Sequence, residues 1–248
     1  MPDRLAAIYD IHGNLPALEA VLATIDERGI ETIVVGGDVV LGPMPRECLE
    51  RLIDLGSRVR FVRGNCDRLV VDAFDGRELG GLPSAIQETI RWTARQLSVT
   101  HRDALAAFPK NMTAHAGGLG DVFFCHATAR SDDEIFTVRS SDSRLRPMFA
   151  GVDQRIIVCG HTHMAFIRAL DDARLINAGS VGMPYGGVGA HWLMLGGGIT
   201  PVTTDYALEA AADRIRATSY PGAEAFARDF VLASPDADRT VELFEGGT

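Results

Sequence analysis

The sequence predicts an α/β protein with a parallel sheet, and two patterns carry that prediction. Short apolar runs typical of strands occur at "RLAAIY", "ETIVVGG" and "VRFV". The segments between them, residues 14–28 and 45–55, place apolar residues at helical spacing, as at Leu15, Leu18 and Val21. Strands separated by helices of this length imply right-handed crossovers and parallel pairing.

The second half of the chain adds more strands than one small sheet needs. Residues 84–107 and the alanine-rich residues 206–232 are expected to be helical. Between them lie seven strand-like runs, "MTAH", "DVFFC", "RIIVCG", "AFIRAL", "ARLINAG", "HWLMLGG" and "ITPVTT". Two packed sheets with helices outside would accommodate these strands. No repeat or linker interrupts the chain, so we expect one domain over residues 1–248, in which a helical stretch at about 68–110 caps the site and selects the substrate.

Composition argues against several classes of function. The chain has a net charge of −9 and no basic block, so we expect no duplex nucleic acid as a partner. It has no apolar run of about 18 residues that would predict a membrane span. The four cysteines lie far apart, and "MPDRLAAIYD" shows no export signal, which predicts reduced thiols and a cytoplasmic location. An anionic substrate would need cations at its site, and metal ions could supply them.

Polar residues of metal-ligand type follow five of the apolar runs directly. They are Asp10, His12, Asp38, Asn65, His126, His161 and His163. Ligand crevices of open α/β sheets lie beyond the carboxyl ends of the strands, so loops from several strands could bring these side chains together. Two pairs have the i, i+2 spacing that points both side chains to one side of an extended segment. Each residue alone could be a turn or cap residue, but the whole set favours a metal site.

The chemistry of this set favours two transition-metal ions and an anionic substrate. Two carboxylates, four imidazoles and one amide carry two negative charges, so two divalent ions would leave the cluster at +2, or at +1 with a hydroxide. Nitrogen and oxygen donors together favour Mn, Fe, Zn, Co or Ni over Ca or Mg. Pairs of such ions, about 3.5–4 Å apart, activate water and clamp the attacking and leaving oxygens of phosphate esters.

The blocks "DIH", "GGD", "GNCD", "CH" and "GHTH" occur in this order over residues 10–163. They resemble the pattern D-x-H, G-D, G-N-[HC]-[DE], H and G-H-x-H of the calcineurin-like metallophosphoesterases, and "WTARQL" is similar to their small single-domain prokaryotic branch. The resemblance implies a four-layer α/β/β/α sandwich with two mixed sheets and flanking helices. It also implies a metal-dependent hydrolase of phosphoric esters that attacks with a metal-bridging hydroxide.

The same resemblance implies two metal sites that share one carboxylate. One ion would be bound by Asp10, His12, Asp38 and His163, and the other by Asp38, Asn65, His126 and His161. Asp38 would bridge the two ions, and the catalytic role would lie with Asp10, Asp38 and Asn65. The expected cofactors are two divalent ions of manganese, iron, zinc, nickel or cobalt.

Three residues near the blocks depart from the family pattern or extend it. Cys66 stands where many members carry a histidine that protonates the leaving group. Its thiol has an ordinary pKa of about 8.5 and either packs as a small apolar side chain or protonates weakly, which favours good leaving groups. Tyr9 stands where the family usually has a small hydroxyl residue. Asp67 is expected to orient its loop.

The substrate is open at this stage. Arg63 and Arg130 are candidates for binding a phosphate bidentately, and Tyr185, where relatives often carry arginine, either stacks on a base or packs at the rim. We expect a phosphorylated small molecule or nucleotide as the partner. Phosphodiester or phosphomonoester hydrolysis competes with diadenosine polyphosphate hydrolysis and with phosphoprotein dephosphorylation. A non-catalytic metal-binding scaffold is less favoured, since no ligand of the pattern is lost. The oligomeric state is left open.

Overall fold

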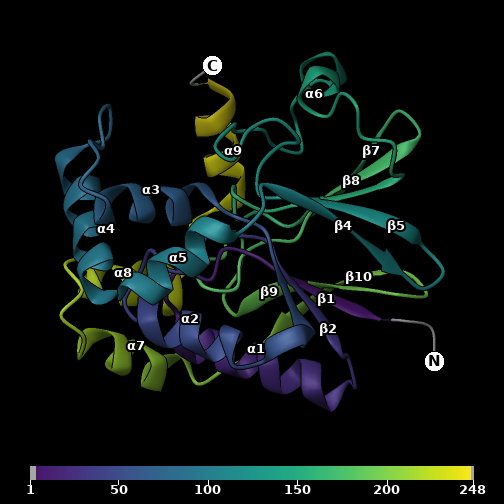
Figure 1. The fold of residues 1–248 in the computed structure, drawn as a ribbon. Coiled ribbons are helices and arrows are strands. Elements are labelled where there is room, and N and C mark those ends of the chain that lie inside the picture. The colour runs from purple at the N-terminus through teal and green to yellow at the C-terminus, as the bar shows by residue number, and fades with distance from the viewer. Residues whose placement is uncertain (1–3, 247–248) are drawn as a thin grey trace.

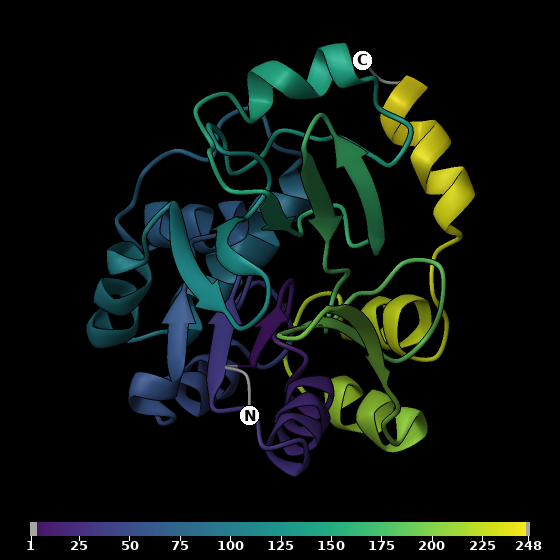
Figure 2. The same cartoon turned by 90° about the vertical axis from the view of Figure 1, so that its right-hand side faces the viewer.

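The computed structural model describes residues 4–246, in which two five-stranded mixed sheets pack against each other with helices on their outer sides (Figures 1 and 2). The predicted α/β class and the sandwich of two mixed sheets are therefore confirmed. Each of the ten runs predicted to be strands forms a strand.

The strands are β1 Leu5–Ile8, β2 Thr32–Val35, β3 Val59–Phe61, β4 Asn111–Ala116, β5 Gly120–Cys125, β6 Ile156–Cys159, β7 Phe166–Leu170, β8 Ala173–Asn177, β9 Ala190–Leu195 and β10 Ile199–Thr204. The helices are α1 Leu15–Glu27, α2 Pro45–Ile53, α3 Asn65–Phe74, α4 Ser84–Gln96, α5 Val99–Ala107, α6 Asp142–Met148, α7 Leu208–Arg216, α8 Ala223–Phe226 and α9 Ala237–Gly246. A 3₁₀ turn, Gly56–Arg58, precedes β3, and a π-helical turn, Ala227–Val231, follows α8.

The first sheet has the order β10-β9-β1-β2-β3. Strands β1, β2 and β3 are parallel, as predicted, and Ile8 pairs with Val35, which pairs with Phe61. Because these last strand residues are in register, the loops that begin with Asp10, Asp38 and Asn65 leave the sheet at one edge.

The second sheet has the order β4-β5-β6-β8-β7, and β5, β6 and β8 are parallel. Phe124 pairs with Val158 near the carboxyl ends of β5 and β6. His126 follows the first of these strands, and the loop with His161 and His163 follows the second. Each sheet thus delivers part of the predicted ligand set from its carboxyl edge.

Three apolar clusters separate the four layers. Along β1, Ala6 and Ile8 pack with residues of α1 and α2, while Leu5 and Ala7 on the other face pack against the second sheet. A third cluster joins the outer face of the second sheet to α6, where Leu145 is fully buried. This alternation is the period-two pattern of a strand with both faces covered.

The helices differ from expectation at a few places. The helix expected over residues 84–107 breaks at Leu97, because Ser98 begins α5 with its side chain accepting from the His101 backbone N–H. The segment 206–232 also divides, into α7, which ends at Arg216, and α8, whose N-cap residue Gly222 has no side chain to cap the helix. Helices α6 and α9 were not predicted, since few apolar residues mark them.

Tyr9 explains why two glycines stand beside the predicted ligands. Its fully buried ring lies between the sheets, and its hydroxyl donates to the carbonyl of Val158 at 3.1 Å. A Cβ atom at Gly36 would lie 1.8 Å from this ring, and one at Gly160 would lie 2.5 Å from it. The bulky residue at position 9 is therefore accommodated by close backbone approach on both sides.

Among residues 4–246, no helix is long and apolar enough to cross a membrane. The three helices α3, α4 and α5 occupy most of the stretch 68–110, and its role as a cap stays a prediction. The division of the chain into domains and its cytoplasmic location also stay predictions.

Candidate metal centre

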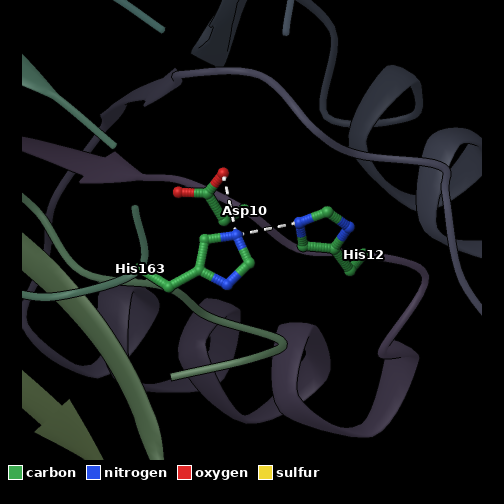
Figure 3. Close-up of side chains that lie close together, drawn as sticks. All are labelled: Asp10, His12 and His163. Carbon is green, nitrogen blue, oxygen red and sulfur yellow. Dashed lines mark hydrogen bonds and ion pairs between the residues drawn. The ribbon is translucent and has the colours of Figure 1, made fainter. Parts of the chain in front are cut away.

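The ligand-type side chains predicted from the sequence converge where the carboxyl edges of the two sheets meet. Two sets of possible donor atoms, each within 4.8 Å of one another, are Asp10, His12 and His163, and Asp38, His126 and His161. The first set is shown in Figure 3, where both imidazoles and the carboxylate point toward one another. The grouping agrees with the two ligand sets implied by the resemblance; metal binding by these residues stays a prediction.

In the first set, the two imidazoles face each other through the same nitrogen. The Nε2 atoms of His12 and His163 lie 3.1 Å apart, and Nε2 of His163 lies 3.6 Å from Oδ1 of Asp10. The Nδ1 atoms point away, to the backbone carbonyls of Leu41 at 3.0 Å and Met183 at 2.9 Å. Because carbonyls only accept, both Nδ1 atoms carry the proton and both Nε2 atoms present lone pairs.

The second set has the same design. Nδ1 of His126 donates to the carbonyl of Gly36 at 2.9 Å, which leaves Nε2 facing the site. That Nε2 lies 3.0 Å from Oδ1 of Asn65 and 3.4 Å from Oδ2 of Asp38. The ring of His161 lies with its centroid 5.1 Å from that of His126. Asn65 therefore joins the cluster even though it carries no charge.

Asp38 lies between the two sets. Its Oδ2 is 3.7 Å from Nε2 of His12 and 3.4 Å from Nε2 of His126. Its other oxygen, Oδ1, accepts from the backbone N–H of Cys66 at 2.9 Å. A single carboxylate oxygen thus reaches both groups of donors, which is the geometry that a shared ligand needs.

The buried carboxylate of Asp10 has an oxygen that a bound cation would satisfy. Its side chain is completely buried, and Oδ1 has no hydrogen-bond partner among the described residues. Oδ2 accepts from the backbone N–H of His161 at 2.9 Å. A buried carboxylate oxygen without a partner is costly, and a divalent cation with oxygen and nitrogen ligands would satisfy it. The residues present therefore fit a metal centre.

The backbone is strained at the same residues. Six non-glycine residues between 4 and 246 have a positive φ, and five of them are Asp10, His12, Asp38, His161 and His163. Non-glycine residues rarely adopt this region, at a cost of roughly 1–3 kcal/mol each, and such strain gathers at functional sites. Sequence reasoning placed bends at neighbouring glycines, whereas the structure bends the chain at the ligands themselves.

Asp67 orients the loop, as predicted, and does so from a fully buried position. Its carboxylate accepts from the backbone N–H of Asp38 and Val39, both at 2.9 Å, and of Gly64 at 3.1 Å. These contacts connect the loop after β2 to the start of α3. They fix Asp38 relative to Asn65 across the two loops.

Burial and the carboxylate of Asp38 determine the pKa values of the residues in the buried cluster. Burial lowers the pKa of His12 and His163, and lowers that of His161 to about 4. Burial also opposes charge on His126, but the Asp38 carboxylate raises its pKa to about 10. Burial raises the pKa of Asp10 well above its usual range. Binding of a divalent cation, which needs neutral imidazole ligands, would therefore compete with a proton on His126.

Two residues that sequence reasoning missed hold the loops in place. Asn177, at the end of β8, donates to the carbonyl of Gly160 and to the hydroxyl of Thr162, which supports the loop with the last two histidines. Ser180 donates to the carbonyl of Asp10 at 2.7 Å and accepts from the backbone N–H of Met183. The signal was present in "INAGSVGMP", where polar residues follow a strand directly.

The three predicted substrate residues have different surroundings. Tyr185 lies beside His163, with ring centroids 5.2 Å apart, and stacks on Phe230 with centroids 6.3 Å apart. Arg130 is exposed and forms a bidentate pair with Glu134. Arg63 lines a cavity beside the loop that carries Arg130. Their roles in substrate binding stay predictions.

Comparisons with known proteins agree with this geometry. Residues 4–196 match the calcineurin-like phosphoesterase superfamily domain. The uncharacterised protein MJ0912 of Methanocaldococcus jannaschii is 32% identical over 74% of this chain and 78% of its own length. Phosphodiesterase YfcE of Escherichia coli K12 is 27% identical over 77% of this chain and 86% of its own length.

Solved structures show the same fold. A hypothetical protein, PH1004, from Pyrococcus horikoshii OT3 superposes with a TM-score of 0.79 at 21% identity, over 93% of this chain and 99% of its own. A metallophosphoesterase from Sphaerobacter thermophilus superposes with a TM-score of 0.68 at 25% identity, over 91% and 96%. The family match covers most of the chain. The chain belongs to the calcineurin-like phosphoesterase superfamily and is a phosphoric ester hydrolase.

Proposed function

We propose that the protein hydrolyses phosphate esters, phosphodiesters in particular, with two divalent transition-metal ions held by the predicted ligands. One ion would be held by Asp10, His12, Asp38 and His163, and the other by Asp38, Asn65, His126 and His161. The observation that carries the proposal is the position of Asp38 Oδ2, within 3.7 Å of Nε2 in one set and 3.4 Å of Nε2 in the other.

When bound, the ions would activate a water molecule and neutralise the charge that develops on the phosphate oxygens. The chain's own contribution is to hold the donors in place before the substrate arrives. The Nδ1–H bonds of His12, His126 and His163 to backbone carbonyls fix each ring with Nε2 toward the centre. Asp67 holds the loop of Asp38 against the start of α3 through the backbone N–H groups of Asp38, Val39 and Gly64. Such preorganisation avoids reorganisation cost during the reaction.

The substrate class follows from family relatives and from the charge of the site. The relative from Escherichia coli is named a phosphodiesterase. A symmetrical bis(5'-nucleosyl)-tetraphosphatase from Yersinia enterocolitica is 33% identical over 55% of this chain and 49% of its own length. Phosphodiester hydrolysis is therefore the first proposal and dinucleoside polyphosphate hydrolysis the second. Phosphomonoester and phosphoprotein hydrolysis remain for the assay to compare.

The test is a substrate panel on protein stripped with a chelator and reloaded with Mn²⁺, Fe²⁺, Zn²⁺, Co²⁺ or Ni²⁺. The panel holds p-nitrophenyl phosphate, bis-p-nitrophenyl phosphate, diadenosine tetraphosphate and a phosphoserine peptide. We expect no turnover in stripped protein and restored turnover of the bis-ester after reloading. Turnover that survives stripping, with metal analysis confirming loss of the ions, would contradict metal dependence. No turnover of any ester with any ion would favour the non-catalytic scaffold.

A further inference from the structure

A cavity of about 160 Å³ lies beside the candidate metal centre, and its walls are unusually rich in cations for a chain with a net charge of −9. The side chains of Arg63, Arg68, Lys110 and Arg130 line it, together with Thr128 and Asp132. None of these cations belongs to the ligand set described above.

Two of the four cations already have a carboxylate partner. Arg68 donates from Nε and a terminal nitrogen to Asp132 at 2.8 and 2.9 Å. Arg130 donates from Nε to both oxygens of Glu134, at 2.9 and 3.0 Å. In these bidentate pairs the carboxylates neutralise the two guanidinium groups. Arg68 and Arg130 therefore form walls of the cavity but add little net positive charge to it.

Within residues 4–246, the other two cations form no hydrogen bond with a carboxylate, although the charge of Arg63 is felt by Asp132. Nε of Arg63 is buried without a hydrogen bond in the described part of the chain. Lys110 is exposed, and its ammonium group makes no hydrogen bond or ion pair with any residue between 4 and 246. The backbone N–H of Arg63 donates to the carbonyl of Pro109 at 2.8 Å, which ties the two cationic segments together. A buried donor without a partner is costly, and an anion would relieve that cost.

The cavity shares its supporting loops with the metal centre. Arg63 precedes Asn65 by two residues, which limits their Cα atoms to a separation of about 7.2 Å. Thr128 follows His126 by two residues in the same way. The loop that continues from Thr128 reaches Asp133, which lies near the ring of His161. An anion in the cavity is thus close enough to be part of a molecule that also reaches the centre.

We propose that this cavity binds a second phosphate group of a substrate whose scissile phosphate lies at the metal centre. The substrate class is then a compound with two or more linked phosphate groups, such as a nucleoside or dinucleoside polyphosphate. Arg63 would contact that phosphate with its planar guanidinium group and Lys110 with a mobile point charge. Esters with a single phosphate would leave both cations unused. The inference rests on the proposed function for the position of the scissile group.

The sequence offers a selective probe, because Lys110 is the only lysine of the chain. The rate of acetylation of Lys110 in manganese-loaded protein can be measured by mass spectrometry. The measurement is made in the presence of methylenediphosphonate, which resists hydrolysis, or of inorganic phosphate. Excess Mn²⁺ keeps the centre loaded in the presence of the chelating probe. We expect methylenediphosphonate to slow acetylation of Lys110 about tenfold and inorganic phosphate at equal occupancy to slow it less than twofold.

Variants give the second readout. Lys110→Gln and Arg63→Gln should each raise the inhibition constant of methylenediphosphonate against p-nitrophenyl phosphate hydrolysis about tenfold, as expected for loss of one charge-assisted hydrogen bond. The inhibition constant of inorganic phosphate should change less than threefold. Arg146→Ala is the matched control, because it removes one positive charge from an exposed pair with Asp171 outside the cavity.

The outcomes separate this inference from the proposed function. One outcome is that methylenediphosphonate inhibits hydrolysis equally in the wild type and both variants and does not protect Lys110 from acetylation. That outcome overturns the second phosphate subsite, while the proposed function stands. Failure to hydrolyse any ester with any metal ion overturns the proposed function, and Lys110 protection still reports whether the cavity binds the diphosphonate. Because Lys110 is exposed, the Lys110→Gln protein is expected to fold even if Arg63→Gln does not.

Discussion

The Nε2 atoms of His12 and His163 lie 3.1 Å apart and face each other, while the Nδ1 atoms of both rings point away to backbone carbonyls. Each ring donates through Nδ1 to a backbone carbonyl, and burial lowers the pKa of both, so both are neutral imidazoles with lone pairs directed at each other. Two such lone pairs repel at this distance unless a cation lies within reach of both. The fold therefore brings together two nitrogen lone pairs that one metal ion could bind.

The shared carboxylate gives the first prediction. Asp38→Asn should lose most of the activity and weaken both metal sites, because Oδ2 of Asp38 is the one oxygen near Nε2 in both sets. Metal analysis by mass spectrometry and turnover of bis-p-nitrophenyl phosphate would measure the two effects. Two full equivalents of metal in the mutant together with normal turnover would contradict the bridging role.

Metal binding should also stabilise the fold. The cluster contains an unpartnered carboxylate oxygen on Asp10 and five strained backbone positions, costs that a bound cation would help offset. At a free metal concentration of a hundred times Kd, binding stabilises by about 2.7 kcal/mol, which corresponds to a rise in Tm of roughly 5–11 °C for a chain of this size. Calorimetry of stripped protein with and without Mn²⁺ measures this, and Ca²⁺ serves as the poorly matched control ion.

Loss of Asp67 should destabilise the protein even without metal. Asp67→Ala would leave the buried backbone N–H groups of Asp38, Val39 and Gly64 without their acceptor, at a cost of roughly 3 kcal/mol or more. Urea unfolding of stripped protein isolates this effect from metal binding. Asp72→Ala on the same helix is the control, since Asp72 pairs with the exposed Arg77 and should cost less than about 1 kcal/mol. Equal midpoints for the two variants would show that Asp67 does not hold the loop.

The sequence predicted the strands and the ligand types well because both are local signals. Apolar runs such as "AAIYD" and "IVVGGD" mark a strand and its end. A polar residue that follows a buried parallel strand lies at the carboxyl edge of the sheet, where ligand sites form. Helix ends were harder to predict. The break before α5 depends on the hydroxyl of Ser98 as a cap, and α6 carries just two buried apolar residues, Leu145 and Met148.

The details of the site depend on contacts between segments that lie far apart in sequence. The left-handed backbone at Asp10 and His161 is one such detail, and a hydrogen bond joins these two residues, which lie 151 positions apart. The Nε of Arg63, which has no hydrogen-bond partner among residues 4–246, is another, because its surroundings depend on which carboxylates pair with the neighbouring arginines. Sequence spacing identifies the candidate metal ligands. The packing of the two sheets decides which of these side chains lie together in each set.

Cys66 is predicted not to be the nucleophile. Burial raises the pKa of its thiol well above the usual value, and the charge of Asp38 adds to this, so little thiolate forms at neutral pH. Cys66→Ser should keep at least about a tenth of the activity on p-nitrophenyl esters, measured at full metal occupancy. Loss as large as that of Asp38→Asn, with both metal ions retained, would show that the thiol has a more direct role.

Protonation of the leaving group gives the last prediction. The sulfur of Cys66 lies with donor atoms of His12 and Asp38 within 4.8 Å of one another, so position 66 faces the site but carries a poor acid. General acid catalysis is typically worth about 10²–10⁴-fold and matters most for poor leaving groups. The rate should therefore fall steeply as leaving-group pKa rises across a series of substituted phenyl and alkyl esters. Cys66→His should raise the rate on alkyl esters more than on p-nitrophenyl esters.

A flat dependence in the wild type would mean that another acid acts in place of Cys66. His191 is then the residue to test, since His115 and Arg130 each already face a carboxylate on the surface. His191→Gln would turn a flat dependence into a steep one if the imidazole supplies the proton, and would leave the slope unchanged if it does not.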